Sequence, residues 1–250
     1  DMTWLPADFE VADSHYVPDA SQPLDVLFEN DDLIVVNKRK GVKTHPNSPG
    51  EDGTMMNFAQ AYLAEQGKSA YMVHRLDGDT TGALIIAKNP YVVPMLNQML
   101  RDKTIKRTYL AWVCGNITAT SGTIDAPIGD NPVDSRTRTV NGPNARPAVT
   151  YWHKVHTVYQ NTLVRLALAT GRTHQIRVHT LHAGHPIAFD DRYGDREFDS
   201  ELKGTGLDRL FLHAAALRFE HPNTGEIMRV EAPLDKKLRH CLDVLRKTKA

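Results

Sequence analysis

The segment HRLDGDT, residues 74–80, places one carboxylate, Asp77, directly after an apolar residue and close behind an arginine. An aspartate in a turn ordinarily accepts hydrogen bonds from nearby backbone amides. Three other segments carry side chains that could form a catalytic site together with Asp77. They are TGRTHQIRVH (170–179) with two arginines, RTYLAWVCG (107–115) with a tyrosine beside a basic run, and NKRKGVKTHP (37–46). These segments favour a site in which Asp77 acts by itself.

Two other chemistries compete with that of a lone aspartate. The stretch HQIRVHTLHAGH (174–185) is rich in histidine, but His174 and His179 lie about 140° apart on a helix, and no carboxylate or thiolate at matching spacing completes a metal site. Asp77 and Asp79 could form a glycosidase pair, although nothing else marks a carbohydrate cleft. Phosphate-binding loops, dinucleotide motifs and nucleophile elbows are absent from the sequence.

The composition is that of an ordinary globular protein. Of 250 residues, 41% are hydrophobic and 24% charged, and no apolar run approaches the length of a membrane span. Two cysteines far apart in the chain suggest no disulfide framework and fit a reducing cytoplasm. Thirty basic residues balance thirty acidic ones, so a polyanionic partner would require local clustering, such as the four basic residues within 101–107.

The elements that must position these residues alternate between strands and helices. YMVH (71–74) and GALIIAK (82–88) predict two buried strands, with Asp77 in the loop between them, where strands commonly present catalytic side chains. Further strands are predicted at 33–37, 107–115, 148–157, 162–169, 210–218 and 226–232, the last two joined by the turn HPNTG. Helices are predicted over 55–66 after Thr54, from about 90 to 103, from Thr173 to Ala183 before Gly184, and after Asp235. Hairpins with about four helices indicate an α+β fold.

HRLDGDTTG, TGRTHQIRVHTLHAGHPI and RLFLHAAAL together resemble the RluA-type pseudouridine synthases, which modify ribosomal and transfer RNA. The resemblance runs from about residue 25 to the C-terminus, and residues 183–233 are most similar to members acting on bacterial large-subunit ribosomal RNA. The sequence departs from the family pattern at Thr81, where serine is usual, at Arg39-Lys40, where Pro-Ala is common, and at Phe189, where glycine is frequent.

The resemblance implies a fold and a domain organisation. The fold is the pseudouridine-synthase fold, a central, mostly antiparallel mixed sheet flanked by helices and loops, with the active-site cleft across the sheet. Residues 26–250 would form the catalytic domain. Residues 1–25, which contain three prolines and show no periodicity, would be a linker following an N-terminal S4-like RNA-binding domain that is missing here.

The resemblance also implies the reaction: uracil leaves C1′ of its ribose, rotates, and is rejoined through C5. One carboxylate suffices, because the substrate supplies both the leaving group and the attacking carbon. Asp77 would attack C1′, remove the C2′ proton, or, in an older proposal, attack C6 of the base. Arg177 is the implied cation beside it, able to pair bidentately with the carboxylate, and Arg172 is the competing candidate. Tyr109 would stack on the target base.

The remaining implied site residues would bind the substrate. They are His74, Arg75, Leu76, Thr80, Arg107, Arg172 and Leu212. Arg75 would fill the space left by an extruded uridine, and Leu76 and Leu212 would form an apolar floor. The basic cluster at 101–107, with Arg136 and Arg138, is expected to contact phosphates, so that binding weakens as salt rises.

The expected partner is therefore RNA, with ribosomal RNA favoured over transfer RNA. A catalytically silent RNA-binding module is the alternative from another class. No cofactor is expected, because an isomerisation needs no redox or energy input. Neither a metal nor a membrane is expected, and the protein is predicted to be a cytoplasmic monomer.

Overall fold

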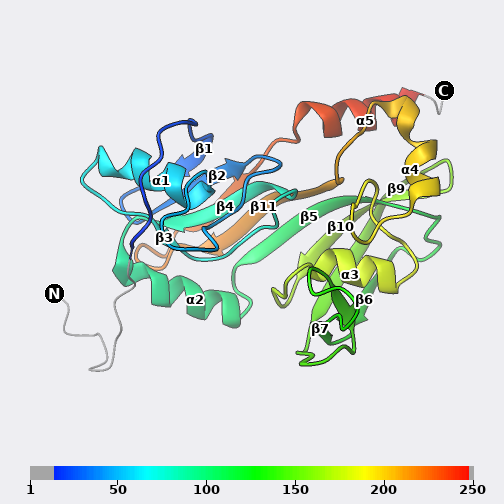
Figure 1. Ribbon diagram of the computed structural model, residues 1–250, viewed down its shortest axis with the longest axis horizontal. Helices are drawn as coiled ribbons and strands as arrows, with labels where there is room; N and C mark the ends of the chain where they lie inside the picture. The colour runs from blue at the N-terminus through cyan, green and yellow to red at the C-terminus, as the bar shows by residue number, and fades with distance from the viewer. Residues whose placement is uncertain (1–13, 248–250) are drawn as a thin grey trace.

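The structure, a computed structural model, describes residues 14–247, which are built on one large mixed sheet (Figure 1). Its strands follow the order β1-β2-β4-β11-β5-β10-β9-β6, with β3 paired to β4 and β12 to β11. They are β1 (Val26–Glu29), β2 (Leu33–Lys38), β3 (Tyr71–Met72), β4 (Thr81–Ala87), β5 (Lys106–Val113), β6 (Ser121–Asp125), β9 (Val149–Val158), β10 (Asn161–Leu168), β11 (Leu212–Glu220) and β12 (Ile227–Glu231). A separate hairpin is formed by β7 (Ile128–Asp130) and β8 (Arg138–Val140).

Five α-helices cover this sheet. They are α1 (Met55–Ala64), α2 (Val93–Arg101), α3 (Gln175–His182), α4 (Arg196–Glu201) and α5 (Lys236–Lys247), with short 3-10 turns η1 (Pro90–Val92) and η2 (Lys203–Thr205). The α1 N-terminus is a reciprocal cap, in which Asn57 N–H donates to the Thr54 hydroxyl and Thr54 N–H to the Asn57 side chain. The α5 N-terminus is capped by Asp235, which accepts from Leu238 N–H at 2.9 Å.

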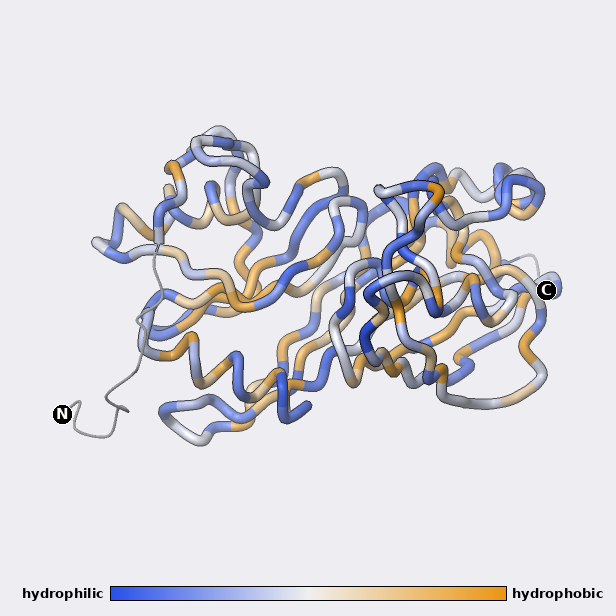
Figure 2. Tube along the Cα trace, turned by 60° about the horizontal axis from the view of Figure 1, so that its bottom comes forward, coloured by the Kyte–Doolittle hydropathy of each residue, from blue (hydrophilic) through white to orange (hydrophobic). Residues whose placement is uncertain are grey.

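The continuous apolar run in β2 is explained by helices on both faces of the sheet. Leu33 and Val35 belong to the core that contains the α2 residue Leu96, whereas Ile34 and Val36 belong to the core that contains the α1 residue Met56. Successive strand residues point to opposite faces, so a strand covered on both sides needs no polar positions. Figure 2 shows hydrophobic segments along the strands and hydrophilic ones in the outer loops.

The two halves of the sheet are joined where β4 and β11 run parallel, pairing Thr81 with His213 and Gly82 with Ala214. Gly82 has a φ of +114°, and a Cβ there would lie 2.1 Å from the Ala214 carbonyl oxygen. Only glycine fits this close approach of two backbones. Among the strands of residues 14–247 this is the one parallel pair, and the loop that carries Asp77 ends at it.

The α+β fold and the mostly antiparallel mixed sheet are confirmed. The predicted strand at 71–74 is too long, because the ladder covers only Tyr71 and Met72 and His74 lies beyond it. The β1, β6, β7, β8 and α4 elements were not predicted. They are short, and β6 lies at a sheet edge with alternating exposed residues that carry little hydrophobic signal.

Of the predicted linker, residues 1–13 lie outside the described residues. Residues 14–25 form no helix or strand, yet they pack on the rest of the fold: the Ser14 hydroxyl donates to the Ala70 carbonyl at 2.7 Å, and Asp19 N–H donates to the Asn57 carbonyl at 3.1 Å. The boundary at residues 25 and 26 stays a prediction. Within residues 14–247, the helices are all too short or too polar to cross a bilayer.

Candidate active site

The loop that carries Asp77 is fixed from behind by hydrogen bonds to its backbone. The Lys38 ammonium donates to the carbonyls of Gly78 (2.7 Å) and Thr80 (3.0 Å), and the Arg209 guanidinium donates to the Asp79 carbonyl (3.1 Å). Thr80 N–H donates to the Asp77 carbonyl at 3.1 Å. Burial lowers the pKa of Lys38 to about 7, although the charges of Asp77 and Asp79 oppose that shift. The hydrogen bonds fix the backbone of the loop directly after Asp77.

Arg177, on α3, lies beside that carboxylate. Its Nη1 is 3.4 Å from Asp77 Oδ2. Its Nε lies 2.7 Å from Oδ2 of Asp190, and its Nη2 lies 2.7 Å from Oδ1 of the same carboxylate. Nη2 also lies 3.1 Å from Asp191 Oδ1. Its guanidinium carbon is 5.1 Å from the centre of the Tyr193 ring, within cation–π distance. The predicted bidentate pairing with Asp77 is therefore wrong: Asp190 holds the fork, and Asp77 receives a single, longer contact.

The Arg177 guanidinium stays charged although it is buried. Burial lowers its pKa, but the hydrogen bonds and charge of Asp190, with the charges of Asp77 and Asp191, raise it by more, so that the net shift is upward. The side chain is 5% exposed and that of Asp77 is 17% exposed. A cation fixed by a second carboxylate can thus face Asp77 without depending on it for its own position.

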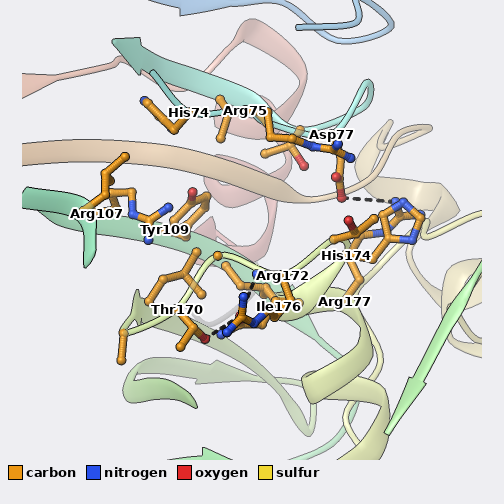
Figure 3. A pocket seen from close by; sticks show the side chains of 18 of the residues that line it. His74, Arg75, Asp77, Arg107, Tyr109, Thr170, Arg172, His174, Ile176 and Arg177 are labelled. Carbon is orange, nitrogen blue, oxygen red and sulfur yellow. Dashed lines mark hydrogen bonds and ion pairs between the residues drawn. The ribbon is translucent and has the colours of Figure 1, made fainter. Parts of the chain in front are cut away.

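The ten residues named as the candidate site all line one cavity of about 610 Å³ (Figure 3). They are His74, Arg75, Leu76, Asp77, Thr80, Arg107, Tyr109, Arg172, Arg177 and Leu212. They come from the loop between β3 and β4, from β5, from the segment that leads into α3, from α3 itself and from the start of β11. The predicted cleft across the sheet is therefore present, and it brings the ten residues together.

The apolar wall of this cavity is also core. Tyr109 is 5% exposed, Leu76 is 6% and Leu212 is 3%, and all three belong to the larger hydrophobic cluster. Burial, the largest effect, raises the pKa of Tyr109, and the Asp77 charge adds to it against the opposing charge of Arg107. Its phenol is thus neutral across the physiological pH range. These three residues are part of the hydrophobic core and also line the cavity.

The polar residues of the wall differ in how they are held. Arg172 Nε donates to the Pro147 carbonyl at 2.8 Å, which directs this side chain away from Asp77 and leaves Arg177 as the partner. Arg75 is exposed and forms no ion pair with any residue in the described part of the chain. Thr80 is buried. His74 Nε2 accepts from Ile85 N–H at 3.0 Å, and burial, aided by the Arg107 charge, lowers its pKa to about 3.

Several residues of the site were not predicted from the sequence. Asp190 and Asp191 lie 13 and 14 positions after Arg177 and hold its guanidinium. His174 begins α3 with a left-handed backbone at φ 57°, and its Nδ1 is 2.7 Å from the Tyr193 hydroxyl. The DDRY run at 190–193, two acids with an arginine and a tyrosine after a buried turn, was the available signal.

The histidine-rich stretch forms hydrogen bonds rather than a cluster of ligands. His179 is fully buried, with Nδ1 2.8 Å from the Thr150 hydroxyl and Nε2 2.9 Å from the Ala126 carbonyl oxygen, so both ring nitrogens are occupied. His182 is exposed on the same helix. Over residues 14–247, no three histidine, cysteine, aspartate or glutamate side chains gather as a metal site would require.

The predicted phosphate contacts lie around the cavity in different states. Arg101 and Lys103 are exposed at its rim, whereas Arg107 is buried in its wall. Arg136 is held by Asp134 within its own loop, with Nε 3.0 Å from Oδ1 and Nη2 2.9 Å from Oδ2, so its charge is already compensated. Arg138 lies beside Arg146 and Arg172 in an adjoining hollow of about 440 Å³.

Comparison with known proteins gives the family. A family model described as RNA pseudouridylate synthase matches residues 32–182, well over half of the chain. The chain belongs to this family, whose members are enzymes that convert uridine in RNA to pseudouridine. Its fold is that of a pseudouridine synthase.

Curated relatives are similar over most of the chain. The ribosomal large subunit pseudouridine synthase C of Yersinia pestis is 50% identical over 223 residues, which span 89% of this chain and 69% of the relative. The protein of the same name from Escherichia coli strain K12 is 46% identical over 224 residues, 88% of this chain and 70% of that protein.

Solved structures agree on the fold. Human RNA pseudouridylate synthase domain containing 1 superposes with a TM-score of 0.72 at 27% identity, covering 92% of this chain and 96% of that one. Human RNA pseudouridylate synthase domain containing 4 gives a TM-score of 0.71 at 24% identity, covering 88% and 92%, and supports the fold alone.

Proposed function

We propose that this enzyme isomerises specific uridines in large-subunit ribosomal RNA, with Asp77 as its single catalytic carboxylate and without a cofactor. The observation that carries the proposal is the Asp77 side chain in the wall of the cavity, 3.4 Å from a guanidinium that another carboxylate already fixes. The choice of ribosomal RNA rests on the curated relatives, which are 46–50% identical and named for that substrate.

The chemistry requires one ionised carboxylate beside the target nucleoside. Asp77 attacks C1′ of the ribose, removes the C2′ proton or attacks C6 of the base, and each route begins with a negatively charged oxygen. Arg177 places a positive charge 3.4 Å from Asp77 Oδ2. Because Asp190 fixes the guanidinium bidentately, the cation keeps its place when the substrate displaces solvent around Asp77.

The target uridine has to leave its stack to reach this cavity. Tyr109 offers a ring in the wall on which the extruded base can stack, and Arg75, exposed at the mouth and without an ion pair among the described residues, is placed to fill the vacated space. Recognition of a splayed-out base and of the RNA backbone suits single-stranded or looped RNA rather than a continuous duplex.

Conversion of a uridine-containing fragment of large-subunit ribosomal RNA tests the proposal. The native protein should convert it without change of mass, giving a product that carbodiimide labels. Asp77→Asn should lower the single-turnover rate at least about 1,000-fold, because no other carboxylate replaces it. The control is Asp79→Asn, which removes the neighbouring carboxylate of the same loop and should leave conversion largely intact.

The other outcomes point to the alternatives. Equal conversion by native protein and Asp77→Asn would contradict the role of Asp77. RNA binding without any conversion would indicate a silent binding module, and release of free base or sugar would indicate a glycosidase. A transfer RNA fragment run in parallel, and pseudouridine mapping in cells that lack the protein, would show which RNA is the substrate.

A further inference from the structure

Arg107 is a buried cation without a counterion. Its side chain is 8% exposed, yet no carboxylate in the described chain lies within ion-pair distance of its guanidinium. Its Nε–H is shielded from solvent and has no hydrogen-bond partner. The other buried arginines of this protein, Arg177 and Arg209, are paired with Asp190 and Asp235. Burying an unpaired charge is strongly unfavourable, so an arginine held in this way indicates an electron-rich group that arrives with the substrate.

His74, in the same cavity wall, is a second donor without a partner. The backbone N–H of Ile85 can only donate, so His74 Nε2 must accept, and the neutral ring carries its hydrogen on Nδ1. That Nδ1–H is buried and has no partner. The ring is neutral because burial and the nearby Arg107 charge lower its pKa to about 3. Two donors without partners thus belong to residues in the wall of one cavity.

The position of these donors relative to Asp77 identifies the acceptor. Arg107 and Tyr109 lie two residues apart on β5, so both point to the same face, about 7 Å apart along the strand. The charges of Arg107 and Asp77 both act on the Tyr109 phenol, and Figure 3 shows Tyr109 between them. A base stacked on Tyr109 with its ribose at Asp77 therefore directs its far edge towards Arg107 and His74.

We propose that Arg107, with His74 beside it, binds the carbonyl oxygen on the far edge of the uracil and stabilises the negative charge of the base while it is detached from the ribose. This inference rests on the proposed function, in which the bond between C1′ and N1 is broken. The bonding electrons then remain on uracil, and the charge spreads from N1 to the carbonyl oxygens. A buried cation aimed at a developing oxyanion is the arrangement that lowers such a barrier.

The symmetry of uracil explains how one site can serve both ends of the reaction. A half-turn about the axis through N3 and C6 exchanges N1 with C5 and C2 with C4. The far edge thus presents the O4 carbonyl in uridine and the O2 carbonyl in pseudouridine. The base can rotate, form the bond between C1′ and C5, lose the C5 proton to solvent and gain one at N1. Atoms and oxidation state are conserved, and Arg107 faces a carbonyl before and after the turn.

Gly171 gives the guanidinium its room. A Cβ built at this position would lie 3.2 Å from Arg107 Nη1 and 3.6 Å from Nη2, so the backbone of the segment leading into α3 closes over the cation. A side chain at position 171 would press on Nη1, so glycine leaves the guanidinium in place in the cavity wall.

Arg107→Met tests the proposal, because it removes the charge and keeps much of the volume. The single-turnover rate on a uridine-containing ribosomal RNA fragment should fall about 100-fold or more, whereas the dissociation constant and its salt dependence should change little. On the same fragment with 5-fluorouridine at the target, the fluorine stabilises the departing anion by itself. Consumption of that nucleoside should then fall only about 10-fold. Arg107→Lys, which keeps the charge but not the fork, should lie between Met and native.

A second measurement separates this role from a structural one and needs no substrate. Removing an uncompensated buried charge should raise the urea midpoint of unfolding in Arg107→Met. The matched control is Arg165→Met. Arg165 lies on the adjacent β10 and pairs with Leu110, so it is exposed on the face opposite Tyr109 and should affect neither rate nor midpoint.

Three results would overturn the proposal: a lower urea midpoint for Arg107→Met, an equal loss of rate on the two substrates, or a flatter salt dependence of binding. The last would assign Arg107 to a phosphate. Failure of the proposed function is distinct from these, because it would appear as conversion that does not depend on Asp77.

Discussion

At the scale of single residues, the site consists of the Asp77 carboxylate, the Arg177 guanidinium beside it, and a second carboxylate, Asp190, that holds the guanidinium in place. Arg177 forms a bidentate ion pair with Asp190 through Nε and Nη2, and it contacts Asp77 through Nη1 alone, at 3.4 Å. The contact with Asp77 involves only Oδ2, and the Asp77 side chain is 17% exposed. In the proposed mechanism, this leaves a carboxylate oxygen for the ribose.

Asp190→Asn should therefore lower both the free energy of unfolding and the rate of turnover, although Asp190 does not itself act on the substrate in the proposed mechanism. It leaves the buried Arg177 without its main counterion, and breaking a buried pair is expected to lower the free energy of unfolding by about 3 kcal/mol. Turnover should fall as well, because the guanidinium loses its fixed orientation. Urea unfolding and single-turnover rates check both effects.

Asp191→Asn is the matched control for that prediction. Asp191 also contacts Nη2 of Arg177, at 3.1 Å, but its side chain is 66% exposed. Exposed ion pairs contribute little, so unfolding should change by less than about 1 kcal/mol. A loss as large as that of Asp190→Asn would show that the exposed contact, and not the buried one, holds Arg177.

The site residues could be predicted only in part from the sequence. The motifs gave Asp77 and two arginines, and the geometry selects Arg177 because Arg172 is bonded to the Pro147 carbonyl. Asp190 was missed because the DDRY run shows two neighbouring acids but not that the packing of this turn against α3 brings them to Arg177. The orphan state of Arg107 is likewise invisible in a sequence, since it is defined by partners that are absent from the folded surroundings.

At the scale of elements, the site depends on two strands brought unusually close. Gly82 lets β4 lie against Ala214 of β11, and the Asp77 loop enters β4 one residue earlier. The strong local signals of the sequence, such as the Thr54 cap and the apolar run of β2, fixed the elements on either side. The meeting of β4 with β11 could not be read from them, because it joins distant segments in parallel.

Gly82→Ala should accordingly be destabilising. Its Cβ would lie 2.1 Å from a backbone oxygen, at a φ of +114° that side chains rarely adopt, so the strands must separate. We expect a loss of about 2 kcal/mol or more in urea unfolding. Gly204→Ala is the control, because a Cβ there meets nothing within 4 Å. An unchanged midpoint for Gly82→Ala would show that the strands tolerate the added atom.

At the scale of the whole molecule, three buried histidines make stability depend on pH. Burial lowers the pKa of His74 to about 3, and it also lowers the pKa values of His179 and His213 from the ordinary 6.5. Between pH 6.5 and those lower pKa values, these histidines are protonated in the unfolded chain but remain neutral in the folded protein. Stability from this source is complete above pH 6.5 and is lost as the pH falls.

Urea unfolding at pH 7.5 and 5.5 should show this loss, with about 1 kcal/mol from His74 alone. His179→Gln, which keeps hydrogen-bonding capacity without titrating, should make the pH dependence less steep. His182→Gln, exposed on the same helix, should not. An unchanged pH dependence in His179→Gln would show that His179 does not contribute to the acid sensitivity.

The pairing of β4 with β11 also determines at which stage of synthesis the cavity can be completed. Thr81 and His213 meet across 132 positions of chain, and the floor residue Leu212 arrives with that late strand. Contacts so distant in sequence form slowly, and chains are synthesised from the N-terminus. A nascent polypeptide that already contains Asp77 therefore lacks one wall of its cavity until β11 has been synthesised.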